Sequence, residues 1–381
     1  MKKSLLLFSC IIINSLSYAQ CNGRYETEIF SSTSVSEVNY SDVYNDTRHL
    51  MDIYTPDGDT EINRPLIIFA HGGSFMGGDK NLSDCVDFCN SFAKKGYVTA
   101  SVNYRLVSQA NQQNFLLSQE EQYETILKAV ADIKSAIRYF RKDFTTNNTY
   151  GIDTSTIFIA GSSAGAVAML HLAYIDAISD LPNSVTYVDI LSGQSITFNP
   201  QNIITTIGGD LEGDAGNDGY SSKVSGVISF AGGINNVSWI DAADEPLVSV
   251  QGDADQTVSY NCSYGMGIPT VVELCGSGEM HPQANTVNLI NDVLVLPGAD
   301  HDWFSSGNSD PRFVDALEFT TNFLYPLLPC NQANSISENI TRKKILRITD
   351  MLGRNTIQNT RSALFYIYDD GSVEKKLLLN K

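Results

Sequence analysis

The chain has 381 residues and a formal net charge of −18 at pH 7, from 43 acidic and 25 basic residues. This length allows one sizeable domain of about 300 residues with small additions. The first 19 residues carry +2 and residues 335–381 carry +4, so the body between them carries −24. An acidic body argues against nucleic acid or anionic lipid as a partner.

Residues 1–19 are typical of a secretory signal peptide. Two lysines precede an apolar run over 5–16, and the segment ends in a small-x-small sequence. The apolar run is too short for a transmembrane span, so no stable membrane span is expected. Cys21 follows Gln20, which is not the small residue that lipidation signals prefer, so we do not expect a lipoprotein.

Apolar and β-branched runs predict eight strands, which alternate with helices from the third strand on. The expected strands are 25–30, 49–54, 66–70, 98–103, 156–160, 226–231, 247–250 and 293–296, and the clearest helices are 81–95, 120–144 and 164–175. This order predicts an α/β fold with a mostly parallel sheet covered by helices on both faces. Ligands then bind beyond the carboxyl ends of the strands.

Two insertions should shape a substrate site. Residues 176–224 follow the helix after the fifth strand and are expected to form a small cap, and residues 259–291 separate the last two strands. Within the first insertion, residues 210–218 are rich in Asp, Glu and Asn and look like a calcium loop. They lack the glycine at the sixth position of an EF-hand loop, and no metal site is predicted.

The third expected strand runs directly into His71-Gly72-Gly73-Ser74-Phe75. A glycine-rich loop lets backbone N–H groups approach a developing oxyanion without side chains in the way. The segment resembles the H-G-G-G loop of esterases, with a serine where that family often has a third glycine. The resemblance implies that Gly73, Ser74 and Ala164 supply the oxyanion N–H groups, and that His71 organises the loop.

The fifth expected strand ends in Gly161-Ser162-Ser163-Ala164-Gly165, and a helix of small residues follows at once. In a G-x-S-x-G sequence between a strand and a helix, the central serine is held on a sharp, strained turn and exposed for reaction. We therefore predict Ser163 as a nucleophile. The alternative is an ordinary Gly/Ser loop of an α/β protein. The presence or absence of partner residues for the serine decides between the two.

The strand over 247–250 leads into a segment that resembles the H-G-x-x-D-x-x-V sequence that carries the acid in many hydrolases. Alignment on Gly252 and Val258 selects Asp255 as the acid. Spacing alone separates it from Asp253, which stays an alternative.

Elimination among five histidines selects the base. His171 lies eight residues after Ser163 on one helix, about 12 Å along its axis, which is too far for a hydrogen bond. His71 belongs to the glycine-rich loop and His49 to an early strand. His281 is interpreted as structural or substrate-facing, and only His301 directly follows a strand. We predict His301 as the general base.

The order Ser163, Asp255, His301 resembles that of the α/β-hydrolase superfamily, within its short carboxylesterase, feruloyl-esterase-like and hormone-sensitive-lipase-like group. Further resemblance lies in residues 71–80 and 101–106. It implies a secreted serine carboxylic-ester hydrolase that works through an acyl-enzyme without a cofactor, on a small-molecule ester or one linked to a polysaccharide. The alternatives are a lipase of longer acyl chains and a non-catalytic binding module with this fold.

Aromatic residues near the motif loops are candidates for substrate binding. They are Phe75, Tyr260 and Trp303. Simple packing is the alternative for each, because aromatic side chains are mostly found in cores.

Six cysteines follow the expected signal peptide, which favours disulfides in an exported chain. Cys262 and Cys275 form the most plausible pair, because that bond closes the loop after the acid. Cys85 and Cys89 lie four apart in an expected helix and could pair with each other or elsewhere. A zinc site is not expected, because no histidine lies at ligand spacing from them.

The C-terminal residues 335–381 contain short alternating runs with a hairpin signal at Asp370-Gly371. The sequences D-x-L-G-R and Y-x-Y-D-D-G-x-V-E-K-K resemble the short C-terminal sorting signal of the type IX secretion system of Bacteroidota. The resemblance implies secretion machinery as a partner and release or display outside the outer membrane; a small binding module is the alternative. The expected organisation is a signal peptide over 1–19, a catalytic domain over 20–330 and a sorting segment over 335–381.

Overall fold

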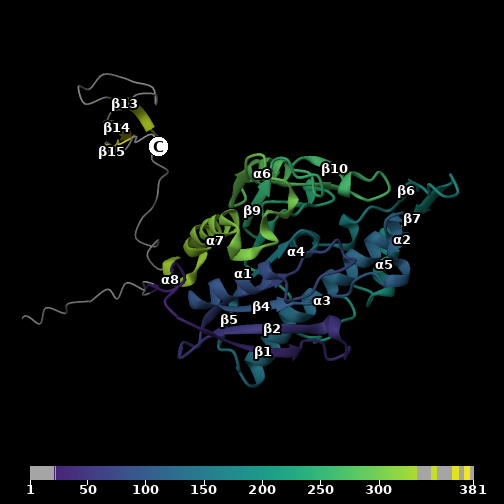
Figure 1. Cartoon of the computed structure of the whole chain (residues 1–381), viewed down its shortest axis with the longest axis horizontal. Helices are drawn as coiled ribbons and strands as arrows, with labels where there is room; N and C mark the ends of the chain where they lie inside the picture. Colours follow the sequence, from purple (N-terminus) through teal and green to yellow (C-terminus); the bar gives the residue numbers. More distant parts are fainter. Residues whose placement is uncertain (1–20, 22, 333–344, 350–362, 369–372, 378–381) are drawn as a thin grey trace, which may run out of the picture. The chain divides into compact units, whose positions relative to one another are not determined.

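The computed structural model describes residues 21, 23–332, 345–349, 363–368 and 373–377 (Figure 1). The larger of two compact units comprises residues 21–329, and the segment from Cys330 onward belongs to the other. The expected signal peptide lies outside the described residues. None of the helices in the described ranges is both long and apolar enough to cross a bilayer.

The larger unit is built on one eight-stranded sheet with the order β1-β2-β4-β3-β5-β8-β9-β12. The strands are β1 Thr33–Asn39, β2 Leu50–Pro56, β3 Arg64–Ala70, β4 Val98–Val102, β5 Ile152–Ser162, β8 Gly226–Phe230, β9 Leu247–Gly252 and β12 Asn291–Leu296. β2 pairs antiparallel with β1 and β4, and the other pairings are parallel. The expected α/β-hydrolase fold with a mostly parallel sheet is confirmed.

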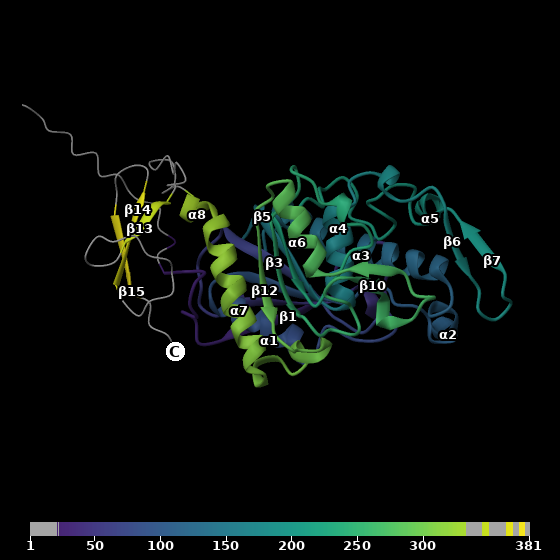
Figure 2. The ribbon, with the colours of Figure 1, turned by 90° about the horizontal axis from the view of Figure 1, so that it is seen from above.

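Helices cover both faces of this sheet. The long helices are α1 Ser83–Lys94, α3 Gln119–Thr146, α4 Ala164–Tyr174, α6 Ser277–Thr286 and α7 Pro311–Leu324. α1 and α7 lie on one side, and α3, α4 and α6 lie on the other (Figure 2). Since both faces are covered, β3 and β4 are buried along their whole length, and β3 reads as an apolar run from Pro65 to Ala70.

The expected first strand, residues 25–30, is wrong. This segment is irregular, and the N–H groups of Tyr25, Ile29 and Phe30 donate to the carbonyl groups of Lys94 and Lys95. The last carbonyl groups of a helix have no partner inside it, so this segment satisfies the end of α1 instead of joining the sheet. The first strand follows it as β1.

Both insertions carry small elements. The first contains the hairpin β6 Val185–Val188 and β7 Ser195–Phe198 with helix α5 Pro200–Thr206, and the second contains the hairpin β10 Cys262–Tyr264 and β11 Glu273–Cys275 before α6. The remaining α-helices of the described residues are short: α2 Gln112–Phe115 and α8 Pro329–Gln332.

In the calcium-like segment 210–218, two acidic side chains form ion pairs with arginines. Glu212 pairs with Arg138 at 2.6 Å, and Asp214 pairs with Arg105 at 2.6 Å. These contacts fasten the segment to α3 and to the loop after β4. Among the described residues, no group of three or more His, Cys, Asp or Glu side chains could hold a metal ion.

The expected disulfide between Cys262 and Cys275 is present and joins β10 to β11. Each of Cys21 and Cys330 also takes part in a disulfide. The pairing considered for Cys85 and Cys89 is wrong, because both thiols are free and fully buried on α1. Residues four apart on a helix have Cβ atoms about 5–6 Å apart, farther than the roughly 3.5–4.5 Å that a disulfide allows.

The C-terminal unit contains a three-stranded antiparallel sheet of β13 Ile345–Thr349, β14 Ala363–Tyr368 and β15 Val373–Leu377. β14 and β15 are the two strands that the hairpin signal predicts, while residues 370 and 371 themselves lie outside the described residues. The sorting role of this segment stays a prediction.

A buried lysine in the larger unit gives a testable effect on stability. Lys95 is only 7% exposed, and its Nζ donates to Thr321 Oγ1 at 2.5 Å. Burial lowers the pKa of Lys95 to about 8, whereas an unfolded lysine titrates at about 10.4. The unfolded chain therefore binds more protons between these two values, and the contribution of Lys95 to stability rises as the pH rises through this window.

We expect Lys95→Met to raise Tm at pH 7 by about 3 °C, because the variant buries no charge. The gain should shrink at pH 10, where native Lys95 is already neutral. The hydroxyl of Thr321 keeps its bond to the Leu317 carbonyl. Calorimetry at both pH values tests this, with Lys94→Met as the half-buried control. A lower Tm for Lys95→Met at pH 7 contradicts the expectation.

Candidate active site

Ser163 lies on a strained turn between β5 and α4. Its φ of 51° and ψ of −121° are rare for a residue with a side chain. The turn is tight because α4 starts against β3: a Cβ atom at Gly165 would lie 2.6 Å from the carbonyl carbon of Ala70. The N–H of Ser163 donates to the Phe230 carbonyl at 2.8 Å, which holds the turn to β8.

The structure brings Ser163, Asp255 and His301 together at the carboxyl ends of β5, β9 and β12. His301 Nδ1 lies 2.8 Å from Asp255 Oδ2, and His301 Nε2 lies 2.7 Å from Ser163 Oγ. An ionised carboxylate only accepts, so Nδ1–H donates to it and Nε2 is left to accept from the Ser163 hydroxyl. All three residues are buried. This arrangement can pass a proton from the hydroxyl to the imidazole.

The two aspartates after β9 have different partners. Asp255 Oδ1 accepts the N–H groups of Thr257 and Val258, both at 2.9 Å, which leaves Oδ2 for His301. Asp253 Oδ1 instead accepts the N–H of Gly298 at 2.6 Å in an exposed position. The geometry favours Asp255 over its alternative.

The remaining histidines have other partners. His71 Nδ1–H donates to the Gly72 carbonyl at 2.7 Å, and its ring stacks on Tyr104 with centroids 4.4 Å apart. Burial lowers the pKa of His71 to about 4, so its ring is neutral near pH 7. The other three bond elsewhere: His49 to Asp46 and Asp132, His171 to Asn235, and His281 to Asn291.

The glycine-rich loop lies directly beside Ser163. A Cβ atom at Gly72 would lie 3.2 Å from Ser163 Cβ. The next three residues, Gly73, Ser74 and Phe75, all have positive φ, and the Gly73 carbonyl accepts the N–H groups of Met76 and Gly77. Within the described part of the chain, the N–H groups of Gly73 and Ser74 make no hydrogen bond. Ala164 opens α4, where the first N–H groups also lack a partner inside the helix.

Sequence reasoning missed Asp84, which lies behind the turn. The Ser162 hydroxyl donates to Asp84 Oδ2 at 2.6 Å, and both residues are buried. Burial raises the pKa of Asp84, which also lies in the first turn of α1, where a negative charge is favoured. The bond ties the residue before Ser163 to α1. An acidic residue in the first turn of a helix is common, so the sequence held no signal for it.

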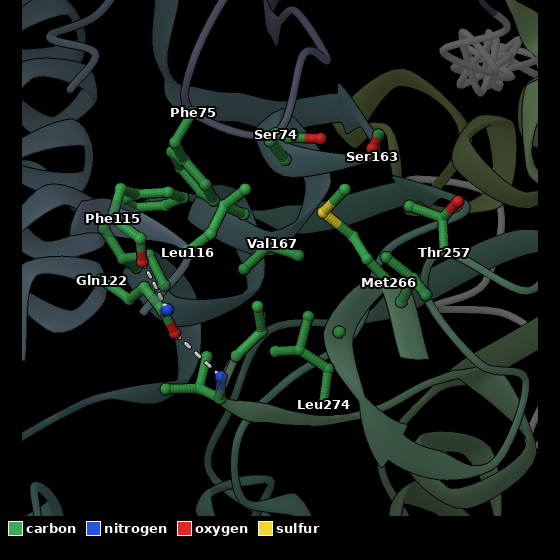
Figure 3. Close-up of a pocket in the computed structure, with 16 residues that line it drawn as sticks. Ser74, Phe75, Phe115, Leu116, Gln122, Ser163, Val167, Thr257, Met266 and Leu274 are labelled. Atoms are coloured by element: carbon green, nitrogen blue, oxygen red, sulfur yellow. Dashed lines mark hydrogen bonds between the residues drawn. The ribbon is translucent and has the colours of Figure 1, made fainter. Parts of the chain in front are cut away.

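An apolar pocket opens next to Ser163 (Figure 3), with an empty volume of about 530 Å³ that includes open solvent. None of the described residues that line it is charged. Its lining consists of Ser74, Phe75, Phe115, Leu116, Gln122, Ile126, Ser163, Ala164, Val167, Thr257, Val258, Gly265, Met266, Val271, Val272 and Leu274.

Of the three aromatic residues considered for substrate binding, only Phe75 lines this pocket. Trp303 is instead 1% exposed and packs against Phe230, with ring centroids 5.4 Å apart, so it belongs to the core. Tyr260 lies at the start of α6, where its carbonyl accepts the N–H of Gly278. Both lie close to the motif loops in sequence, but neither is among the residues that line the pocket.

Comparison with solved structures supports the fold. Thermogutta terrifontis esterase 2 phosphoramylated by tabun is 21% identical, with 77% of this chain and 94% of that chain covered and a TM-score of 0.52. The propionate-bound form of that thermophilic esterase is 20% identical, with 77% and 93% covered and a TM-score of 0.50. A bifunctional GH43-CE protein of Bacteroides eggerthii is 19% identical, with 77% and 35% covered and a TM-score of 0.51.

No curated protein matches the chain. The sequence model of one family does, over residues 51–267, which is more than half of the chain and includes the glycine-rich loop, Ser163 and Asp255. The chain therefore belongs to the BD-FAE family of α/β-hydrolase-type esterases and is a carboxylic-ester hydrolase.

Proposed function

We propose that this esterase is an exported serine hydrolase in which Ser163, His301 and Asp255 form the catalytic triad. The observation that carries the proposal is the continuous hydrogen-bonded chain from Ser163 Oγ through both nitrogens of His301 to Asp255. A serine hydroxyl is a weak nucleophile unless an adjacent base takes its proton, and this chain supplies such a base with a fixed tautomer.

In the proposed reaction, Ser163 Oγ attacks the carbonyl carbon of the ester while His301 Nε2 takes the hydroxyl proton. The tetrahedral intermediate collapses when the imidazolium gives this proton to the leaving alcohol, and the acyl group stays on Ser163. Water then attacks the acyl-enzyme while His301 takes its proton, and the imidazolium returns this proton to Ser163 Oγ as the carboxylic acid leaves. Asp255 stabilises the imidazolium in both halves of the reaction.

The N–H groups of Gly73, Ser74 and Ala164 are the proposed oxyanion donors. Two observations support this role: their location beside Ser163 and, among the described residues, the lack of a hydrogen-bond acceptor for the N–H groups of Gly73 and Ser74. Donors that are already held in place need no reorganisation as charge develops, and each is worth about 3 kcal/mol in known cases.

The pocket indicates how an ester would bind. Sugar hydroxyls need hydrogen-bonding partners, whereas an acyl group gains from apolar contact. We therefore assign the acyl group to the pocket and the alcohol to the solvent side of Ser163. An acyl-decorated polysaccharide is the proposed natural substrate, in keeping with an exported enzyme that has an acidic body.

The proposal of export is based on two segments of the sequence. Residues 1–19 have the composition of a signal peptide, and residues 335–381 resemble a type IX sorting signal that addresses secretion machinery. The disulfide between Cys262 and Cys275 supports an oxidising compartment.

A fluorophosphonate probe tests the proposed chemistry. We expect one probe molecule to bind covalently to the peptide that contains Ser163, as found by mass spectrometry, and hydrolysis to stop in proportion to labelling. The Ser163→Ala variant is the control and should stay unlabelled. A folded native protein that takes up no probe would favour a binding module and contradict the proposal.

A further inference from the structure

One wall of the apolar pocket is a loop closed by a disulfide. Residues 262–275 run from β10 to β11, and the Cys262–Cys275 bond joins their ends. This segment contributes Gly265, Met266, Val271, Val272 and Leu274 to the lining. This wall is therefore formed by the insertion between β9 and β12 and not by the strands of the sheet.

Hydrogen bonds hold this loop at a fixed distance from the facing wall. Gln122 of α3 is 1% exposed; its Oε1 accepts the Val272 N–H at 2.8 Å, and its Nε2 donates to the Phe115 carbonyl at 2.6 Å (Figure 3). Thr270 Oγ1 donates to the Leu116 carbonyl at 2.6 Å. Phe115 and Leu116 line the facing wall, so the width of the pocket is fixed before a ligand enters.

Met266 reaches into this pocket from the loop. Its backbone has a φ of 57° and ψ of 15°, and its N–H donates to the Thr257 carbonyl at 2.7 Å. This conformation directs the side chain inward: Figure 3 shows the thioether extending below Ser163 toward Val167. The residue is 40% exposed, so its side chain is not enclosed by its neighbours.

We infer that Met266 determines the length of the acyl chain that the enzyme accepts. The inference rests on the proposed attack by Ser163. In this account, the Met266 side chain occupies the space into which a longer acyl group would extend. The walls around it are fixed by Gln122, Thr270 and the disulfide, whereas the methionine is unbranched and flexible. Its truncation should lengthen the pocket without moving the walls.

The test compares nitrophenyl esters from acetyl to decanoyl on the native enzyme, Met266→Ala and Met266→Phe. We expect Met266→Ala to raise the ratio of kcat/KM for the hexanoyl ester to kcat/KM for the acetyl ester by about tenfold or more. One methylene that fits an apolar pocket changes kcat/KM by about tenfold or more. Met266→Phe should lower the same ratio. Both substitutions keep a Cβ atom, so they add no backbone strain at this position.

Two controls separate pocket length from general damage. Met266→Leu nearly preserves side-chain volume and should keep the native ratio, and Tyr264→Ala alters an exposed residue of the same loop that does not line the pocket. An unchanged ratio in folded Met266→Ala, or the same shift in Tyr264→Ala, overturns the inference. Neither result bears on the proposed function, which is tested separately by probe labelling and by the loss of turnover in Ser163→Ala.

Discussion

Replacing Ser163 with alanine is expected to lower kcat for nitrophenyl acetate by about 10⁵- to 10⁶-fold while Tm stays within about 2 °C of the native value. The hydroxyl makes one hydrogen bond, to His301 Nε2, and an alanine has the same Cβ atom for the strained turn. The loss is therefore chemical and not structural. The small residual rate comes from binding and from the backbone donors beside the turn.

The adjacent serine is the matched control for this experiment. Ser162→Ala keeps the reacting hydroxyl but removes the donor to Asp84 Oδ2. We expect this variant to lose stability, because a buried carboxyl group loses one of its hydrogen-bond donors, and to lose less than about tenfold in kcat per folded molecule. Activity in Ser163→Ala above about 1% of native would contradict the assigned nucleophile.

Asp255→Asn is expected to lower kcat by about 10⁴-fold at neutral pH. The backbone N–H groups of Thr257 and Val258 donate to Oδ1 in the native protein. An asparagine must turn its carbonyl oxygen toward these donors, so its NH₂ group faces His301 Nδ1. That nitrogen then has to accept, Nε2 carries the proton, and the imidazole can no longer take one from Ser163.

The neighbouring acid provides the comparison. Asp253→Asn keeps an acceptor for the Gly298 N–H and should change kcat less than about threefold, as expected for an exposed site. Steady-state kinetics of both purified variants, with folding checked by circular dichroism, decide the matter. A larger loss in Asp253→Asn than in Asp255→Asn would show that the acid is assigned to the wrong residue.

The sequence predicted the sheet and the three converging side chains because each side chain follows an apolar strand. Carboxyl ends of parallel strands meet at one edge, so Ser163, Asp255 and His301 were expected there without any knowledge of their contacts. The choice between Asp253 and Asp255 depended on spacing alone. In the structure, the hydrogen bonds of the loop distinguish the two aspartates. Sequence spacing carries no information about these bonds.

Features that depend on contacts between distant segments could not be predicted. The side chain of Asp84 bonds to Ser162, 78 positions away in the sequence, and that of Gln122 bonds to Val272, 150 positions away. Trp303 follows a motif histidine, but its burial against Phe230 depends on how α7 covers the sheet. The irregular run over 25–30 has the composition of a strand, yet it satisfies the carbonyl groups at the end of α1.

The most direct measurement is to quench the enzyme during turnover of nitrophenyl acetate and to locate the acyl group by peptide mass spectrometry. One acetyl group on the hydroxyl of residue 163, gained rapidly and lost again as substrate runs out, is the predicted result. A single acetyl group that accumulates and decays at turnover rate on any other side chain would contradict the account.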